Sequence, residues 1–204
     1  MYIEESSSSA NFADIITMLA YNGDAISFAE IPAALMGIFL ILFFTKLRKP
    51  DSMTSFLELT TPSIKVVVKW LIIMLIIIGL MELGYILFER NTPDFMTKLY
   101  SSTKNLSLLW IAVIIAAPIF EELLFRGYLF EGIKQTAVGI NGAIVITSAS
   151  WAIIHLQYES FEVITIFLIG IILGVAKVKS RSLYIPIAMH MLMNLSTSIM
   201  MELS

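Results

Sequence analysis

Cysteine is missing from this 204-residue sequence, and histidine occurs only twice, at His155 and His190. The lack of cysteine excludes disulfides, cysteine metal ligands and a thiolate nucleophile, so the chemistry of cysteine proteases is ruled out. Charged residues are also scarce, at 14%, and the net charge is −3. No basic patch or aromatic-interleaved stripe indicates nucleic-acid binding, so no nucleic-acid partner is expected.

Apolar residues, in contrast, are abundant. They make up 58% of the sequence, and the mean hydropathy is +0.86, far above that of an ordinary soluble domain. A helix needs about 20 apolar residues to cross a bilayer, and the segments of about that length are 28–47, 66–88, 106–126, 139–158, 162–178 and 183–201. We therefore expect an integral membrane protein of the all-α class, a polytopic transmembrane helix bundle with about six membrane helices and the lipid bilayer as a partner.

The chain divides into three expected parts. Residues 1–27 are acidic and serine-rich and lack the features of a signal peptide, which indicates a polar N-terminal tail. Residues 28–105 contain two membrane helices and a loop, and residues 106–204 form a four-helix core with the polar motifs described below. Glu30 and Pro32 are expected to begin the first membrane helix, because proline is tolerated in a first turn.

The distribution of basic residues predicts the orientation in the membrane, because lysine and arginine concentrate in cytoplasmic loops. The loops after the first, third and fifth segments hold ten of the 13 basic residues, and the opposite side holds Arg90, Lys98 and Lys104. Both termini are therefore predicted to lie outside the cytoplasm.

The third segment contains the stretch PIFEELLFRG, which begins at Pro118. Glu122 and Arg126 are four residues apart and are predicted to pair on one helix face, whereas Glu121 is rotated by about 100°. Pro118 lacks an N–H and should free the carbonyl of Ile114 and bend the helix. Isolated charges in a membrane helix usually mark function. A competing interpretation is that they end the helix at the cytoplasmic interface.

Both histidines lie in apolar segments, each with a helical neighbour four residues away. Trp151 and His155 share one face, and His190 and Asn194 share another. Interhelical hydrogen bonds would explain each pair alone. Together with Glu121, Glu122 and Arg126, these groups are the ingredients of a water-activating hydrolytic site.

Other chemistries have little support in the sequence. There is no His-Glu-x-x-His motif, no Gly-x-Ser-x-Gly elbow and no paired-aspartate signature. Ser148 and Ser150 lie near His155, but we interpret them as small packing residues. Gly170 and Gly174 are expected to bring helices close together inside the bundle. Glu82 could line a substrate path, but it is expected rather to make a helix–helix hydrogen bond.

The expected depths of the two histidines disagree. At 1.5 Å per residue, His155 would lie about 24 Å along a helix that begins near Gly139, and His190 about 12 Å along one that begins near Ser182. Either the fourth helix begins deeper, or the stretch HLQYES turns within the protein.

Three motifs in this order resemble the CAAX proteases and bacteriocin-processing enzymes, the CPBP family, also called Abi proteins, which includes the type II CAAX prenyl endopeptidases. They read EELLFR from Glu121, WAIIH from Trp151 and HMLMN from His190, with tryptophan where the family usually has phenylalanine. The resemblance covers roughly residues 110–200. It implies an intramembrane endopeptidase of a bacterial cell membrane that hydrolyses membrane-associated peptides or proteins.

The resemblance also implies roles for single residues. Glu121 would be the water-activating base and His155 its helper, while His190 and Asn194 would hold the oxyanion; Glu122 and Arg126 would give structural and electrostatic support. Family members are described both as metalloproteases and as metal-free glutamate enzymes. A divalent metal such as zinc, with Glu121, His155 and His190 as candidate ligands, and a metal-free mechanism therefore both stay open.

Two other functions are compatible with the same pattern. A non-catalytic membrane binding or bacteriocin-immunity protein could use the same fold to hold a peptide. A small transporter is less well supported, because the chain lacks interrupted helices and internal symmetry.

Overall fold

The structure, a computed structural model, describes residues 12–203, and all regular structure in this range is helical. The first part contains α1 (Phe12–Ala20), α2 (Gly23–Leu47), α3 (Met53–Phe56), α4 (Ile64–Leu87) and α5 (Asp94–Ser101). A long composite helix follows, made of α6 (Leu106–Trp110), the π-helical η1 (Ile111–Ala116), α7 (Ala117–Glu122), the π-helical η2 (Leu123–Leu129) and α8 (Phe130–Ile133). The last helices are α9 (Gly139–Ile153), α10 (Ser160–Ser180) and α11 (Tyr184–Leu203).

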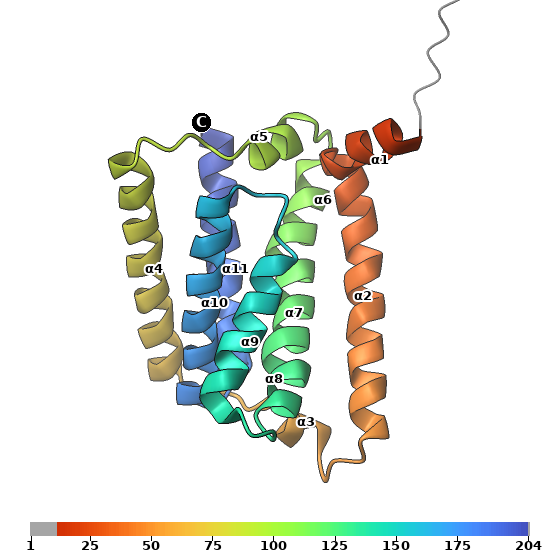
Figure 1. Cartoon of the computed structure of the whole chain (residues 1–204), viewed down its shortest axis with the longest axis vertical. Coiled ribbons are helices and arrows are strands. Elements are labelled where there is room, and N and C mark those ends of the chain that lie inside the picture. The colour runs from red at the N-terminus through yellow and green to blue at the C-terminus, as the bar shows by residue number, and fades with distance from the viewer. Residues whose placement is uncertain (1–11, 204) are drawn as a thin grey trace, which may run out of the picture.

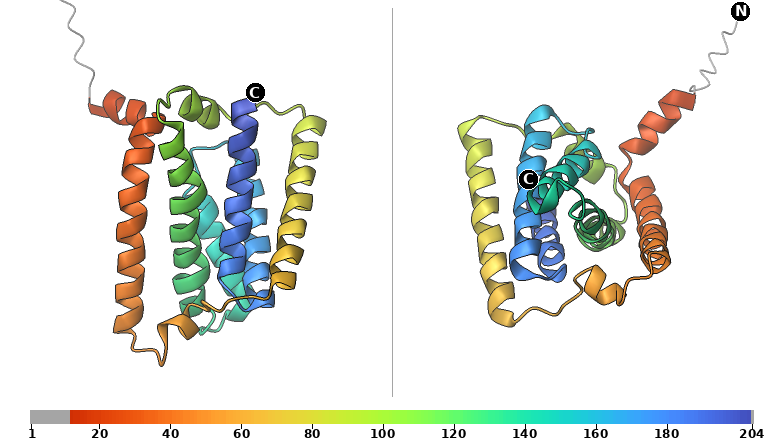
Figure 2. Two further views of the ribbon diagram at one scale, coloured as in Figure 1. Left: turned by 180° about the vertical axis from the view of Figure 1, so that it is seen from behind. Right: turned by 60° about the horizontal axis from the view of Figure 1, so that its bottom comes forward.

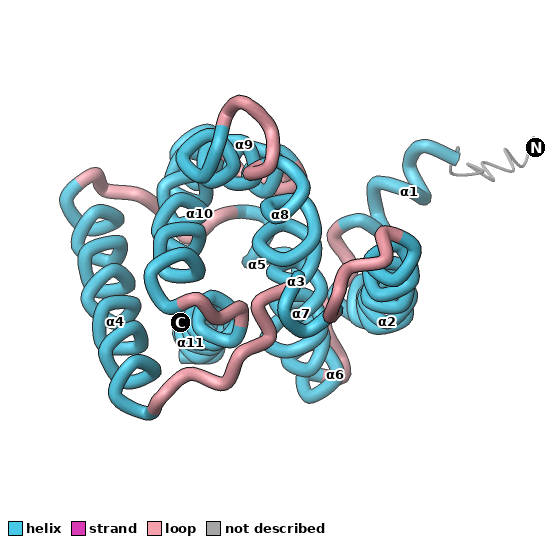
Figure 3. Tube along the Cα trace, turned by 90° about the horizontal axis from the view of Figure 1, so that it is seen from below, coloured by secondary structure: helices cyan, strands magenta, loops and turns pink. Residues whose placement is uncertain are grey.

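The helices form a polytopic bundle in which the two N-terminal long helices flank the rest (Figure 1, Figure 2). Seen along the bundle, α2 and α4 stand on opposite sides of a core made by the composite helix, α9, α10 and α11 (Figure 3). Helix α5 lies across one end, near the C-terminus, and α3 lies at the other end (Figure 1). The expected all-α bundle is confirmed.

Four helical stretches are long and apolar enough to cross a membrane: Gly23–Leu47, Ile64–Leu87, Leu106–Ile133 and Ser160–Ser180. Large apolar side chains on them are exposed, for example Phe28, Ile64 and Leu80, and such surfaces require a lipid environment. The chain is an integral membrane protein. Helix α9 has only 15 residues and α11 contains several polar residues, so the count of six crossings stays a prediction.

The first membrane helix begins earlier than predicted. The Asn22 side chain accepts a hydrogen bond from the Ala25 N–H and caps α2 at Gly23, so Pro32 lies inside the helix and not in its first turn. The range predicted as a polar tail, residues 1–27, also includes α1, whose sequence FADIITMLA has apolar residues at helical spacing. Residues 1–11 lie outside the described part.

Pro118 changes the composite helix in a way that differs from the prediction. In η1 the Ala117 N–H donates to the carbonyl of Ala112, five residues back. In that register the missing N–H of Pro118 frees the carbonyl of Val113, one residue before the predicted Ile114. The freed carbonyl has another donor, described below.

The conflict between the histidine depths is resolved by a turn inside the protein. Helix α9 ends at Ile153 and His155 lies in the turn that follows, before α10 begins at Ser160. Figure 1 shows α9 ending part-way up the bundle, below the start of α10. Irregular backbone at this depth is tolerated where it lines a cavity.

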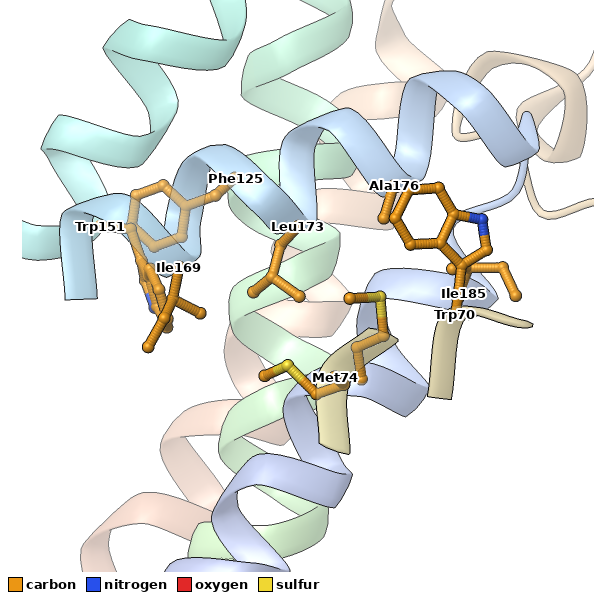
Figure 4. Packing of buried hydrophobic residues seen from close by; sticks show 9 residues of the cluster. Trp70, Met74, Phe125, Trp151, Ile169, Leu173, Ala176 and Ile185 are labelled. Atoms are coloured by element: carbon orange, nitrogen blue, oxygen red, sulfur yellow. The ribbon is translucent and has the colours of Figure 1, made fainter. Parts of the chain in front are cut away.

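The core packs the site helices against one another. Trp151, Phe125 and Ile169 lie together in the largest cluster of buried residues, which continues to Met74 and Trp70 on α4 (Figure 4). Gly170 packs against Ser148, and Gly174 packs against Ile144, so the predicted close approach of helices inside the bundle is confirmed for α9 and α10.

A second polar cluster holds the end of the bundle near α3. The ammonium group of Lys177 is buried and contacts the carboxylates of Glu131 and Glu58, the latter at 3.2 Å. The Leu183 N–H donates to the Glu58 carbonyl at 2.9 Å. These contacts tie the segment after α3 to α8, α10 and α11.

Candidate active site

A cavity of about 400 Å³ lies between the helices at the end of the bundle that carries α5. Residues of α2, α4, α5, the composite helix, α10, α11 and the turn after α9 line it. Glu121, His155, His190 and Asn194 are all among these lining residues. The structure therefore brings the four predicted catalytic residues to one cavity.

Glu121 is half-buried and faces the cavity from α7. Its Oε2 accepts a hydrogen bond from the indole Nε1 of Trp151 at 2.5 Å. Trp151 is 1% exposed and packs in the core, so the donor is fixed in place. A hydrogen bond from a rigid donor orients the carboxylate, and the rest of its acceptor capacity remains for another partner.

Glu122 points away from the cavity and is fully buried with Arg126. Its Oε1 accepts from Arg126 Nη1 at 2.9 Å, which confirms the predicted pair. Arg126 Nη2 also donates to the Gly170 carbonyl at 3.2 Å, and the guanidinium lies 4.6 Å from the ring centroid of Trp151. The pair is deep in the bundle, so the interpretation that these charges end the helix at the interface is wrong. Burial of both ions demands that they stay paired.

His155 is half-buried in the turn after α9. Its Nδ1 donates to the Trp151 carbonyl at 2.8 Å, because a carbonyl can only accept. The proton on Nδ1 leaves Nε2 of the neutral ring as the basic nitrogen. A hydrogen bond within the same turn thus takes the place of the interhelical one considered above.

His190 is 3% exposed and connects the motif on α11 to the one on α7. Its Nδ1 donates to Glu122 Oε1 at 3.0 Å. The imidazole packs edge-on against Trp151, with ring centroids 5.1 Å apart, and His155 contacts the same indole at 5.3 Å. Trp151 therefore links both histidines and Glu121.

Asn194 provides the donor for the carbonyl that Pro118 leaves free. Its Nδ2 donates to the Val113 carbonyl at 2.7 Å. One amide hydrogen fixes the side chain to η1, and the second one remains for another acceptor. The irregular helix and the asparagine motif are thus joined in one contact.

The same side chains do not form a metal centre. Within residues 12–203, no three His, Asp or Glu side chains lie close enough together to hold a metal ion. The candidate ligands Glu121, His155 and His190 each meet Trp151 instead. This arrangement does not fit a three-ligand zinc centre.

Several acidic residues of the cavity were not among the predicted site residues. Glu30 and Glu82 line it from α2 and α4, and in the described part of the chain neither makes a hydrogen bond or ion pair, so the predicted helix–helix bond of Glu82 is wrong. Glu162 lines it from α10. Their only signal in the sequence is an acid within an apolar run.

Ser148 bonds to the Ile144 carbonyl and is buried, as expected for a packing residue.

Tyr158 lines the cavity next to His155. Its ring stacks on His155 at 6.3 Å and meets Phe95 of α5 at 5.1 Å. Burial, and secondarily the neighbouring Tyr85 and Tyr100, raise the pKa of the Tyr158 phenol above its ordinary value. The phenol is therefore neutral at physiological pH and is available only as a hydrogen-bonding group.

Comparison with known proteins gives two kinds of match. A family model described as type II CAAX prenyl endopeptidase Rce1-like matches residues 103–196. An uncharacterized 24.3 kDa protein of Escherichia coli is 33% identical over 131 residues, which is 61% of this chain and 59% of that protein. The membrane-embedded CAAX protease MroQ of Staphylococcus aureus (strain USA300) is 28% identical over 166 residues, 76% of this chain and 65% of MroQ. No solved structure matches.

The matched part of the chain thus spans less than two thirds of the length of either relative. The family match includes α7, α9, α10 and most of α11, and so contains all three motifs, whereas α2 and α4 lie outside it. The motifs occur in the expected order, and their side chains meet at one cavity. Together with the matches, this convergence supports an assignment of the chain to the CPBP family of CAAX proteases.

Proposed function

We propose that the protein is an intramembrane endopeptidase that hydrolyses peptide bonds in membrane-associated peptides or proteins. The observation that carries the proposal is the convergence of Glu121, His155, His190 and Asn194 on one cavity within a membrane bundle. Residues 106–204 form its catalytic core. One of the similar proteins, MroQ, is named a CAAX protease, which supports the same class of reaction.

Glu121 acts as the general base in this proposal. Its carboxylate removes a proton from water, and the resulting hydroxide attacks the carbonyl carbon of the scissile bond. The proton then passes to the leaving amine nitrogen as the carbon–nitrogen bond breaks. His155 assists through Nε2, because its Nδ1 proton is held by the Trp151 carbonyl.

His190 and Asn194 stabilise the oxyanion of the tetrahedral intermediate. Nδ1 of His190 donates to Glu122, so a hydrogen bond to the oxyanion has to come from Nε2, which requires a proton on that nitrogen as well. Asn194 donates with the amide hydrogen that does not contact Val113. Removal of one such pre-positioned donor typically lowers kcat by about 10²–10³.

These steps use only side chains of this chain and one water molecule. Within residues 12–203, no group of three His, Asp or Glu side chains is placed to hold a metal ion, so no step is assigned to one.

The first experiment compares cleavage of a panel of membrane-anchored peptides by the purified protein and by Glu121→Gln, with and without a chelator. We expect Glu121→Gln to lower kcat by about 10²–10⁴, as for loss of a general base, and the chelator to have no effect. Glu89→Gln is the matched control, because Glu89 is exposed and lies outside the cavity.

Equal cleavage by the protein and Glu121→Gln would contradict the proposal and favour a binding or immunity protein of the same fold. If the chelator abolishes activity and added zinc restores it, the protein is still a protease, but the metal-free mechanism is wrong.

A further inference from the structure

The cavity is lined by acids on several sides. Glu30 of α2, Glu82 of α4 and Glu162 of α10 join Glu121 among its lining residues, and this lining contains no lysine or arginine. The four carboxylates come from four different helices. The negative charge therefore surrounds the space in which a substrate would lie.

Glu162 has acceptor capacity left over. It is 6% exposed, and its Oε1 accepts from the Tyr85 hydroxyl at 3.2 Å. Arg90 forms an ion pair with the same oxygen at 3.5 Å and a shorter one, at 2.5 Å, with Glu159. The buried Oε2 of Glu162 has no hydrogen-bond partner, and a buried carboxylate oxygen without a partner is costly.

Glu30 and Glu82 have no partner of their own within residues 12–203. Glu30 is half-buried and lies within electrostatic range of Glu121. Like charges in a poorly hydrated space repel each other. A cation brought by the substrate would relieve this repulsion and complete the charge balance of the cavity.

We propose that the site selects substrates that carry an ammonium or guanidinium group within a few residues of the scissile bond. The inference rests on the proposed function and deepens it. Apolar side chains such as Met81 and Met193 line the rest of the cavity, so the substrate segment is apolar with one positive charge. Helices α2 and α4, which lie outside the matched region, thereby set specificity.

The test uses matched peptides that differ only in charge. One has a lysine near the cleaved bond and an acetylated N-terminus, the second has acetyl-lysine at that position, and the third has acetyl-lysine and a free N-terminal amine. We expect kcat/KM to be about tenfold higher for a charged peptide than for the neutral one, mainly through KM. The third peptide shows whether a terminal ammonium serves as well as a side chain.

The variants Glu30→Gln and Glu82→Gln should each reduce this preference severalfold. Glu202→Gln, an exposed residue outside the cavity, should leave it unchanged. Glu82→Lys should favour a peptide with glutamate in place of lysine, and because Glu82 is exposed, this variant is expected to fold.

Equal kcat/KM for the lysine and acetyl-lysine peptides would overturn the charge selection and leave the proposed function intact. If no peptide is cleaved, the proposed function fails, and fluorescence anisotropy of labelled peptides then tests selection alone. A Kd about tenfold lower for the lysine peptide supports the inference, and equal Kd values overturn it.

Discussion

At the scale of single residues, Trp151 contacts more of the site residues than any single acid or histidine of the site does. Its N–H orients Glu121, its carbonyl orients His155, and its ring packs on His190 and under Arg126. Phenylalanine, the usual residue of the family at this place, can provide the packing and the carbonyl but not the N–H. In the sequence the change looks like a conservative exchange of aromatic residues, whereas the structure gives the indole a specific role.

Trp151→Phe should therefore keep the fold but weaken catalysis. Loss of a hydrogen bond to a charged group is worth about 1.5–3 kcal/mol, so kcat should fall by about ten- to a hundredfold while Tm changes little. The control is Trp110→Phe, because the buried Nε1 of Trp110 has no hydrogen-bond partner. If both variants keep full activity in the peptide assay, Trp151 acts through packing alone.

Some of these contacts were predictable from local spacing. Glu122 and Arg126 are four residues apart on a helix, and this spacing alone gives their ion pair. The bonds from Trp151 to Glu121 and from His190 to Glu122 join positions 30 and 68 residues apart. Helical spacing relates only residues a few positions apart, so it cannot predict these two hydrogen bonds. The sequence allowed us to predict that the three motifs come together, but not which side chains bond to each other.

At the scale of elements, the hydropathy pattern gives the long helices because each needs an apolar surface for the bilayer. The pattern predicts neither where the helices end nor where they are irregular. The cap at Asn22 depends on one side chain, and the π-helical register at Pro118 depends on Asn194, which is 76 residues further along the chain. Such contacts determine where a helix ends or becomes irregular, and they leave no trace in the hydropathy of the segment.

The contact between α9 and α10 leads to a prediction about stability. A Cβ on Gly170 would lie 2.9 Å from Ser148 Cβ and 3.1 Å from Arg126 Nη2. Gly170→Ala should therefore destabilise the fold by about 1–3 kcal/mol and reduce activity, because Arg126 must shift. Thermal unfolding in detergent measures the effect.

Gly79→Ala is the matched control on α4. A Cβ there meets nothing within 4 Å, so stability should be unchanged or raised by about 0.5–1 kcal/mol. A Gly170→Ala protein as stable as Gly79→Ala would show that the close approach is not required.

At the scale of the whole molecule, most basic residues and the cavity lie toward opposite ends. Most basic residues, among them Lys46, Lys134 and Arg181, belong to the end with α3, whereas α5 and the cavity lie at the other end. If the basic end is cytoplasmic, as the positive-inside rule predicts, the site opens away from the cytoplasm.

The absence of cysteine makes this orientation easy to test. We expect a membrane-impermeant maleimide to label Thr97→Cys on α5, but not Ser55→Cys on α3, in intact cells. Both positions are exposed, so both should react after lysis, which serves as the control. The reverse pattern in intact cells would place the site on the cytoplasmic side.

The short α9 also has a consequence for the lipid around the protein. Its 15 residues rise about 22 Å, less than the hydrocarbon thickness of about 30 Å. Ile153, Ile154 and Leu156 remain exposed at its end and in the following turn. A bilayer adjusts to such a mismatch by thinning. The headgroup region would therefore dip toward His155 beside this helix, and the distance that water has to travel through hydrocarbon would be shortest there.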